Sequence, residues 1–298
     1  MSMHTGTVIL LGALCGLALV FVWRWWRYSS GRAATDRPRP GDVVVGFGTN
    51  FFDTLGIGSF APTTAIFKFF GRMPDEQLPG TLNAGHALPT VTQALVFIAA
   101  VSVDFVTLIA MIAAAVLGAW LGAGVVAGLP RRAIQLGMGV ALIVAAVLFV
   151  LANLDLIPGG GDARELRGVL LAAAVIVNFL LGALMTLGIG LYAPCLILCS
   201  LLGLNPVAAF PIMMGSCAFL MPPAGLRFVA RGRYSLGAAV GLAVGGIPAV
   251  LIAAYVVRSL PLEWLRWLVV VVVLIAAATL LLSAARGEAA RTRLQAAD

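Results

Sequence analysis

Long apolar blocks separated by short polar connections run through the whole chain. The blocks lie at about 7–22, 43–70, 80–101, 105–128, 133–152, 168–202, 206–226, 235–257 and 265–284. A membrane-spanning helix needs roughly 20 mainly apolar residues, so most of these blocks are long enough to cross a bilayer. No connection is long and polar enough to form a soluble domain. The pattern therefore predicts an all-α polytopic membrane protein.

The first block has no Lys or Arg before it and is followed by arginines at positions 24 to 39. A cleavable signal peptide carries its positive charge ahead of the apolar segment, so this block is interpreted as an uncleaved helix with its N-terminus outside. The basic stretch after it is then cytoplasmic. We expect four parts: an N-terminal helix with its basic linker at 1–42, a first membrane unit at 43–152, a second at 168–284, and a cytoplasmic tail at 285–298.

The two membrane units share a nine-residue motif. Residues 54–62 read TLGIGSFAP and residues 186–194 read TLGIGLYAP. Beyond the motif, glycine and proline stay in register at positions 71 and 203 and at positions 74 and 206. Such self-similarity predicts a duplicated unit, preceded here by one extra helix.

The motif is unfavourable inside a continuous helix because it combines two glycines with a proline. Proline is favoured in the first turn of a new helix. We therefore expect a break in each unit, with a short helix that starts near Pro62 or Pro194 and ends near the glycine at 71 or 203. Two such helix N-termini near the middle of the membrane carry partial positive charge and can bind an anion. The alternative is that these residues only allow close packing or a kink.

Charge placement distinguishes two topologies. If each broken segment crosses the membrane once, the two units are parallel; if each segment enters and returns on the same side, they are inverted. The inverted arrangement places more of the basic residues on the cytoplasmic side, as the positive-inside rule favours. We expect two inverted repeats whose re-entrant, broken helices meet at the midplane, in the inner membrane, with a cytoplasmic C-terminus.

Composition supports the membrane class. The chain is 61% hydrophobic and only 10% charged, whereas soluble domains average about 25% charged residues. The 34 glycines are typical of membrane helices that pack closely. The formal charge is +7, but the arginines lie between apolar blocks, so the expected partner is the lipid bilayer and not nucleic acid. The sequence leaves a homodimer open.

Polar and motif residues around the two breaks are the candidate substrate ligands. This set is Asn50, Thr54, Gly56, Gly58, Pro62, Thr63, Asn83, His86, Asn178, Thr186, Gly188, Gly190, Pro194 and Ser216. Hydroxyls beside a break either satisfy freed backbone groups or bind an oxyanion, and the two asparagines either bind substrate or bridge helices. For His86 there are three interpretations: it donates a hydrogen bond to the anion, it carries a proton, or it only makes a hydrogen bond between helices.

Three charged residues are candidates for coupling or substrate attraction. Asp53 is predicted to be an ionisable group at membrane depth, and such groups usually have a function. One interpretation is that it couples proton movement to transport. The alternatives are that it lies at the membrane surface or that it pairs with Lys68. The lysine either attracts the anion or extends to water. Arg227 belongs to a substrate vestibule or to a cytoplasmic loop. The repeat counterpart of the aspartate is Met185, so its role would be asymmetric.

No cofactor, metal or catalytic set is expected. Cys195 and Cys199 are one helical turn apart and, with Cys217, would suit a soft metal, but no histidine or carboxylate accompanies them in the sequence. We interpret them as core thiols. Because no cluster of carboxylates or histidines faces one membrane surface, the chain is not predicted to be an enzyme.

The glycine-rich segments Gly56 to Pro62 and Gly188 to Pro194, with the order of blocks from about 43 to 284, resemble the sulfite exporter family of the TauE/SafE type. The first helix and linker lie outside this resemblance. The resemblance implies a plasma-membrane permease for small sulfur-containing or organic anions such as sulfite, sulfonates or sulfoacetate. Alternating access around the two helix N-termini is the expected mechanism; an anion channel, or less favourably a membrane-embedded enzyme, is the alternative.

Overall fold

The computed structural model describes residues 3–30, 36–56, 58–126, 161–185 and 190–259, with scattered residues between 136 and 156 and between 264 and 285. Apart from one isolated bridge, between Ala163 and Leu204, the regular elements in these ranges are helices. Four described helices are long and apolar enough to cross a membrane: Thr5–Ser29, Gly168–Met185, Pro206–Ala230 and Leu236–Val256. The predicted all-helical membrane class is confirmed.

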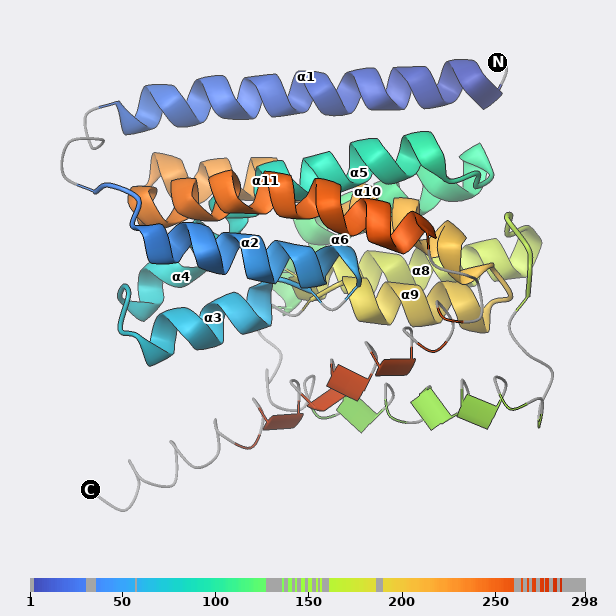
Figure 1. Cartoon of the computed structure of the whole chain (residues 1–298). Helices are drawn as coiled ribbons and strands as arrows, with labels where there is room; N and C mark the ends of the chain where they lie inside the picture. Colours follow the sequence, from blue (N-terminus) through green and yellow to red (C-terminus); the bar gives the residue numbers. More distant parts are fainter. Residues whose placement is uncertain are drawn as a thin grey trace.

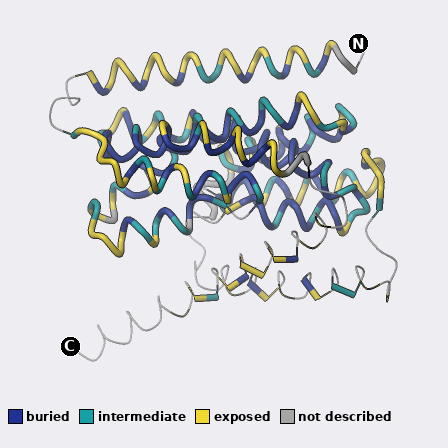
Figure 2. Tube along the Cα trace, in the orientation of Figure 1, coloured by how far each residue is buried: buried dark blue, intermediate teal, exposed yellow. Residues whose placement is uncertain are grey.

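The described helices run roughly parallel or antiparallel to one another (Figure 1). Their bounds are α1 Met3–Ser29, α2 Pro40–Thr54, α3 Phe60–Phe69, α4 Leu78–Gly85, α5 Ala87–Ala100, α6 Phe105–Val126, α8 Gly168–Met185, α9 Tyr192–Leu201, α10 Pro206–Ala230 and α11 Leu236–Ser259, with the 3₁₀ turn η1 Asp75–Gln77 before α4. The buried positions concentrate on α5, α9 and α10, while much of α1 is exposed (Figure 2).

Helix α1 is longer than its apolar block. The sequence predicted a helix over about 7–22, but α1 continues through the first two arginines to Ser29. Arginine is a good helix former, and the Arg27 guanidinium stacks over the Trp23 ring at 5.2 Å. The next helix, α2, begins at Pro40 and not at 43, because proline suits the first turn of a helix. The connection between these two helices is therefore shorter than predicted.

The first motif breaks the chain as predicted. Helix α2 ends at Thr54 and α3 begins at Phe60, with Pro62 in its first turn. Between them Gly56 and Gly58 have φ angles of 101° and 90°. An L-residue with a side chain is strained at these angles, so the two glycines allow the turn that separates the helices.

The second motif also separates two helices. Helix α8 ends at Met185 and α9 begins at Tyr192; residues 186–189, which include the candidates Thr186 and Gly188, lie outside the described residues. Helices α3 and α9 are both ten residues long. Each is followed at the predicted position by a glycine with positive φ, Gly71 at 56° and Gly203 at 89°. Both short helices therefore end as predicted.

The two pairs of helices lie at opposite ends of the molecule (Figure 1). Helices α2 and α3 form the first hairpin, at the end where α1 finishes, and α8 and α9 form the second hairpin, at the other end. Each hairpin packs mainly against a helix from the other half of the chain. Helix α2 lies along α11, and α8 lies along α6.

Glycine permits both of these close helix pairs. A Cβ atom added at Gly118 or at Gly182 would collide with the main-chain carbonyl of Phe179 or of Ala115, across the α6–α8 interface. A Cβ atom at Gly245 would collide with the carbonyl oxygen of Val43, across the α2–α11 interface. Small residues allow such backbone contact, and dispersion forces then hold membrane helices together.

One predicted block is divided in the structure. The apolar block at 80–101 forms two helices, α4 and α5, which meet at His86. Pro89 has no N–H with which to bond the carbonyl four residues earlier, so the helix is interrupted there. The interruption turns the imidazole toward the interior, where it is 0% exposed.

Replacing Gly182 by alanine is expected to lower the thermal unfolding midpoint of the detergent-purified protein by several degrees. The methyl group forces α6 and α8 apart, and overpacking of this kind costs about 2 kcal/mol. The matched control is Gly16→Ala on α1, where an added Cβ has no atom within 4 Å. Equal midpoints for the two variants would contradict the α6–α8 contact.

Candidate functional site

A single glutamine joins the two breaks. Gln93 of α5 donates from Nε2 to Asp53 Oδ2 at 2.8 Å and to Thr54 Oγ1 at 3.0 Å, at the last two residues of α2. Its Oε1 accepts a hydrogen bond from the hydroxyl of Tyr192, the first residue of α9, at 2.5 Å. These side chains are buried. The end of α2 and the start of α9 therefore meet through one side chain.

His86 connects the first break to the body of the molecule. Its Nδ1 lies 3.0 Å from Asn50 Oδ1 on α2, and its Nε2 lies 3.1 Å from Thr63 Oγ1 on α3. The asparagine amide nitrogen donates to the carbonyl of Gly46 at 2.7 Å, so its oxygen accepts from the ring. Nε2 is within hydrogen-bond distance of the threonine oxygen, and the direction of that contact is set by the tautomer of the ring. The predicted candidates Asn50, Thr63 and His86 thus form one chain of hydrogen bonds.

The hydroxyls beside the first break hydrogen-bond to main-chain carbonyls of their own helices. Thr54 donates to the carbonyl of Asn50 at 2.8 Å, and Thr63 donates to the carbonyl of Ser59 at 2.7 Å. Both hydroxyls are fully buried. An unpaired polar group in an apolar interior is costly, and these contacts give each buried hydroxyl a partner; the Ser59 carbonyl also accepts from the amide of Thr63 at 3.1 Å. Whether either hydroxyl binds substrate stays a prediction.

Asp53 lies inside the protein. Its side chain is 3% exposed. Besides Gln93, the hydroxyl and backbone amide of Ser59 interact with its carboxylate. Among the described residues it makes no ion pair, and the lysine considered as its partner, Lys68, is exposed at the C-terminal end of α3. A carboxylate therefore lies beside the residue that precedes α3.

At the position that matches Asp53, the second half of the chain has an uncharged residue. Met185 occupies the counterpart of the aspartate, and Cys217 Sγ lies 3.5 Å from its Sδ atom. Asn178 of α8 donates to the carbonyl of Met111 at 2.7 Å and lies 3.3 Å from Ser216 Oγ. These contacts bridge α8 to α6 and α10. The second half therefore supplies no carboxylate of its own at the position that matches Asp53.

The two short helices present the same main-chain groups. In α3, the first backbone amide with an acceptor four residues earlier is that of Thr63, which bonds to the carbonyl of Ser59. In α9, it is that of Cys195, which bonds to the carbonyl of Leu191. The residue before each is a proline, Pro62 or Pro194, which has no N–H. Two amides therefore remain at each N-terminus for which the helix supplies no acceptor. Such groups favour an anion.

Several predicted candidates lie away from this centre. Arg227 is exposed near the C-terminal end of α10, as Lys68 is on α3. Asn83 donates to the carbonyl of Pro79 within its own helix at 2.9 Å. Gly190 is exposed just before α9, with open space around its Cβ direction. Lys68, Arg227 and Asn83 do not meet the hydrogen-bonded centre through any described contact, whereas Gly190 lies two residues before Tyr192, in front of α9.

Sequence reasoning did not select the two residues that hold the centre together. Gln93 is not among the candidate substrate ligands, and Tyr192 enters only as part of the motif TLGIGLYAP. A signal was present in both cases. Gln93 is an amide in the middle of an apolar helix, and the tyrosine stands where the first motif has Phe60. A buried tyrosine hydroxyl usually has a hydrogen-bond partner.

A second polar contact fixes the first hairpin at its other end. Asp42, in the first turn of α2, accepts two hydrogen bonds of 2.8 Å from Arg72, which follows α3. These hydrogen bonds raise the pKa of the Arg72 guanidinium, so the cation stays charged. The aspartate also accepts from the amide of Arg39 at 3.0 Å. The two ends of the hairpin are thus tied together by a bidentate ion pair.

Comparison with known families assigns the chain. A model of the sulfite exporter TauE/SafE family matches residues 2–149. The chain belongs to the sulfite exporter TauE/SafE family. No curated protein and no solved structure matches it. Proteins of this family are membrane transporters and not enzymes.

The matched range corrects one expectation. The resemblance was predicted over about 43–284, with the first helix outside it. The match instead begins at residue 2 and includes α1, and it ends at residue 149, before the second unit. The first helix is therefore part of what the family model covers. Assignment of the second motif to the same function remains a proposal.

Replacing Tyr192 by phenylalanine is expected to destabilise this TauE/SafE protein by about 1–3 kcal/mol, because the buried Gln93 Oε1 atom loses its donor. The measurement is the thermal unfolding midpoint in detergent. The control is Tyr255→Phe on α11, whose side chain is 77% exposed. If both variants unfold at the wild-type midpoint, the hydrogen bond between the two halves is not stabilising.

Proposed function

We propose that this chain moves a small, sulfur-containing anion, such as sulfite, a sulfonate or sulfoacetate, across the inner membrane by alternating access. The anion would bind at the N-terminus of α9, close to the first break. The observation that carries this proposal is the bridge from Asp53 and Thr54 through Gln93 to Tyr192. This bridge supports the view that the two helix breaks lie next to each other. In alternating access, the substrate site lies at such a junction between the two repeats.

The arrangement of the hairpins supports inverted repeats. The first hairpin enters from one end of the molecule and the second from the other (Figure 1). Each short helix occupies the same place in its own motif, starting at Phe60 or at Tyr192. In this proposal both hairpins are re-entrant, the N-terminus and the second hairpin lie on the outer side, and the first hairpin and the C-terminus lie on the cytoplasmic side.

The chemistry of the centre favours an anion that is bound without a buried arginine. The α9 N-terminus offers the amides of Tyr192 and Ala193, and a helix N-terminus attracts negative charge. At the α3 N-terminus the Asp53 carboxylate already interacts with Ser59. We therefore place the anion at the α9 N-terminus.

The Asp53 carboxylate supplies a means of coupling anion transport to a proton. A carboxylate at Asp53 repels an anion that binds nearby, whereas a protonated carboxyl group does not. Binding of the anion and of a proton to the aspartate would then reinforce each other. Tyr192 and Cys217 are the other titratable groups that interact electrostatically in this neighbourhood.

Replacing Gly190 by leucine is expected to abolish anion transport while the protein still folds. The glycine is exposed and an added Cβ meets no atom within 4 Å, so a bulky side chain fills the space in front of α9 and not the core. Uptake of radiolabelled sulfite and methanesulfonate into proteoliposomes is the readout. The control, Gly12→Leu, adds the same volume to α1 at a position that is also open. Full transport by the Gly190 variant would exclude this location for the anion.

Replacing Asp53 by asparagine is expected to remove the pH dependence of anion binding. In the wild type, the affinity for methanesulfonate rises as pH falls, because protonation removes the negative charge near the site; in the variant it is high at every pH. A sulfonate is used because it stays ionised throughout. The measurement is the methanesulfonate-induced shift in unfolding midpoint between pH 5 and 8, with Glu165→Gln, an exposed carboxylate, as control. A variant that keeps the wild-type pH profile would contradict coupling through this aspartate.

A further inference from the structure

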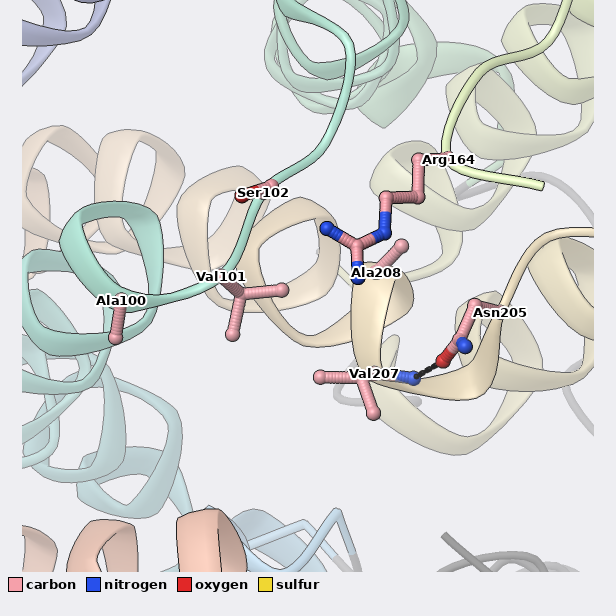
Figure 3. A pocket seen from close by; sticks show the side chains of 7 residues that line it. All are labelled: Ala100, Val101, Ser102, Arg164, Asn205, Val207 and Ala208. Atoms are coloured by element: carbon pink, nitrogen blue, oxygen red, sulfur yellow. Dashed lines mark hydrogen bonds between the residues drawn. The ribbon is translucent and has the colours of Figure 1, made fainter. Parts of the chain in front are cut away.

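A small cavity lies at the second-hairpin end of the molecule, away from the central network. Its volume is about 180 Å³. It is lined by residues 100–102 at the end of α5, by Arg164 from the segment before α8, and by the first turn of α10 (Figure 3). The candidate set drawn from the sequence includes none of these lining residues. The cavity is much smaller than a site for a drug-sized ligand, so it suits a molecule of a few heavy atoms.

The backbone that carries Arg164 is held in place on both sides. The carbonyl oxygen of this arginine accepts a hydrogen bond from the amide of Asp104 at 2.8 Å. The preceding residue, Ala163, pairs with the loop after α9 and accepts from the amide of Asn205 at 2.8 Å. Gly161 lies so close to the carbonyl of Gly203 that no Cβ would fit. The arginine is solvent-exposed, but its position at the cavity is fixed by these contacts.

The polar groups of the cavity are donors. Within the described part of the chain, the guanidinium of Arg164 makes no ion pair with a carboxylate and no side-chain hydrogen bond. Asn205 Oδ1 already accepts from the amide of Val207 at 2.9 Å, which leaves its NH₂ group facing outward as a donor. Ser102 adds a hydroxyl. No carboxylate lines the cavity.

Nearby acidic side chains are already engaged. Asp104 Oδ2 accepts from the amide and the hydroxyl of Thr107 at 2.9 and 3.1 Å. Glu165 pairs with Arg167 at 2.8 Å. The first amides of α10 are also used, since the amide of Ala208 bonds to the carbonyl of Asn205 at 2.9 Å. Binding in this cavity would therefore depend on the Arg164 side chain and not on the helix terminus.

We infer that this cavity binds a small oxyanion with a short carbon group, of the alkyl sulfonate class, and that Arg164 is its principal ligand. A guanidinium presents paired N–H donors that match two oxygens of a planar or tetrahedral anion. The walls contributed by Val101, Val207 and Ala208 are apolar and suit one or two methylene groups. The inference rests on the proposed function, in which this cavity receives the anion on the outer face before it reaches the centre.

The cavity and the central site are separate places on one route. Helix α9 runs from Tyr192, in the central network, to Leu201, close to the cavity. Ten residues of α-helix span roughly 15 Å. An anion held by Arg164 is therefore about one helix length from the N-terminus of α9. Occupancy of one site does not exclude occupancy of the other.

Initial rates of methanesulfonate transport, measured from each membrane face, test this inference. Right-side-out and inverted vesicles carry the wild type, Arg164→Gln or the control Arg167→Gln, whose arginine is 82% exposed on the same segment. Loss of a charged hydrogen-bond donor is expected to raise KM about tenfold, only from the face that carries the cavity and with kcat unchanged. The control keeps wild-type KM on both faces.

Equilibrium binding of radiolabelled methanesulfonate separates this inference from the proposed function. In the Gly190→Leu variant, whose central site is blocked, binding is expected to persist and to be lost when Arg164→Gln is added. If KM on the cavity face and this residual binding are both unchanged by Arg164→Gln, the inference is overturned and the proposed function stands. If the wild type transports no anion but Arg164-dependent binding is present, the proposed function fails and the cavity site stands.

Discussion

A helix can end inside an apolar interior only if the backbone groups that it leaves unpaired find partners. The structure depends on this constraint at two points, where α2 and α8 end before α3 and α9 begin. At the first break, the amides of Leu55 and Gly56 bond to the carbonyls of Phe52 and Asp53, and Gln93 ties the end of α2 to the start of α9. The remaining amides at the helix N-termini supply the positive potential from which the proposed transport function follows.

The two halves of the chain support each other. The first hairpin lies along α11 and the second along α6, so each hairpin is packed against a helix from the opposite half. Glycines such as Gly182 and Gly245 make these contacts close, which gives part of the glycine content a structural reason. The central residues are not symmetric, however, because Asp53 stands where the other half has Met185. In the proposed mechanism, the first half binds the proton and the second half binds the anion.

Much of the fold could be predicted from local sequence. Two glycines and a proline in each motif predicted where the chain breaks, and the starts of α3 and α9 agree with it. The candidate site was predicted less completely, because its key contacts join residues far apart in the chain. Gln93 and Tyr192 are 99 residues apart, and no periodicity relates them. The length of α1 was also underestimated, since arginines that end an apolar block do not end a helix.

The most direct test of the account is a structure of the protein in a bilayer with a bound alkyl sulfonate. The account predicts sulfonate oxygens within hydrogen-bond distance of the amides of Tyr192 and Ala193. It also predicts that the hydrogen bond from the tyrosine hydroxyl to Gln93 is lost or lengthened as the anion enters. A sulfonate bound away from both breaks, with that hydrogen bond intact and no density before α9 at saturating concentration, would contradict it.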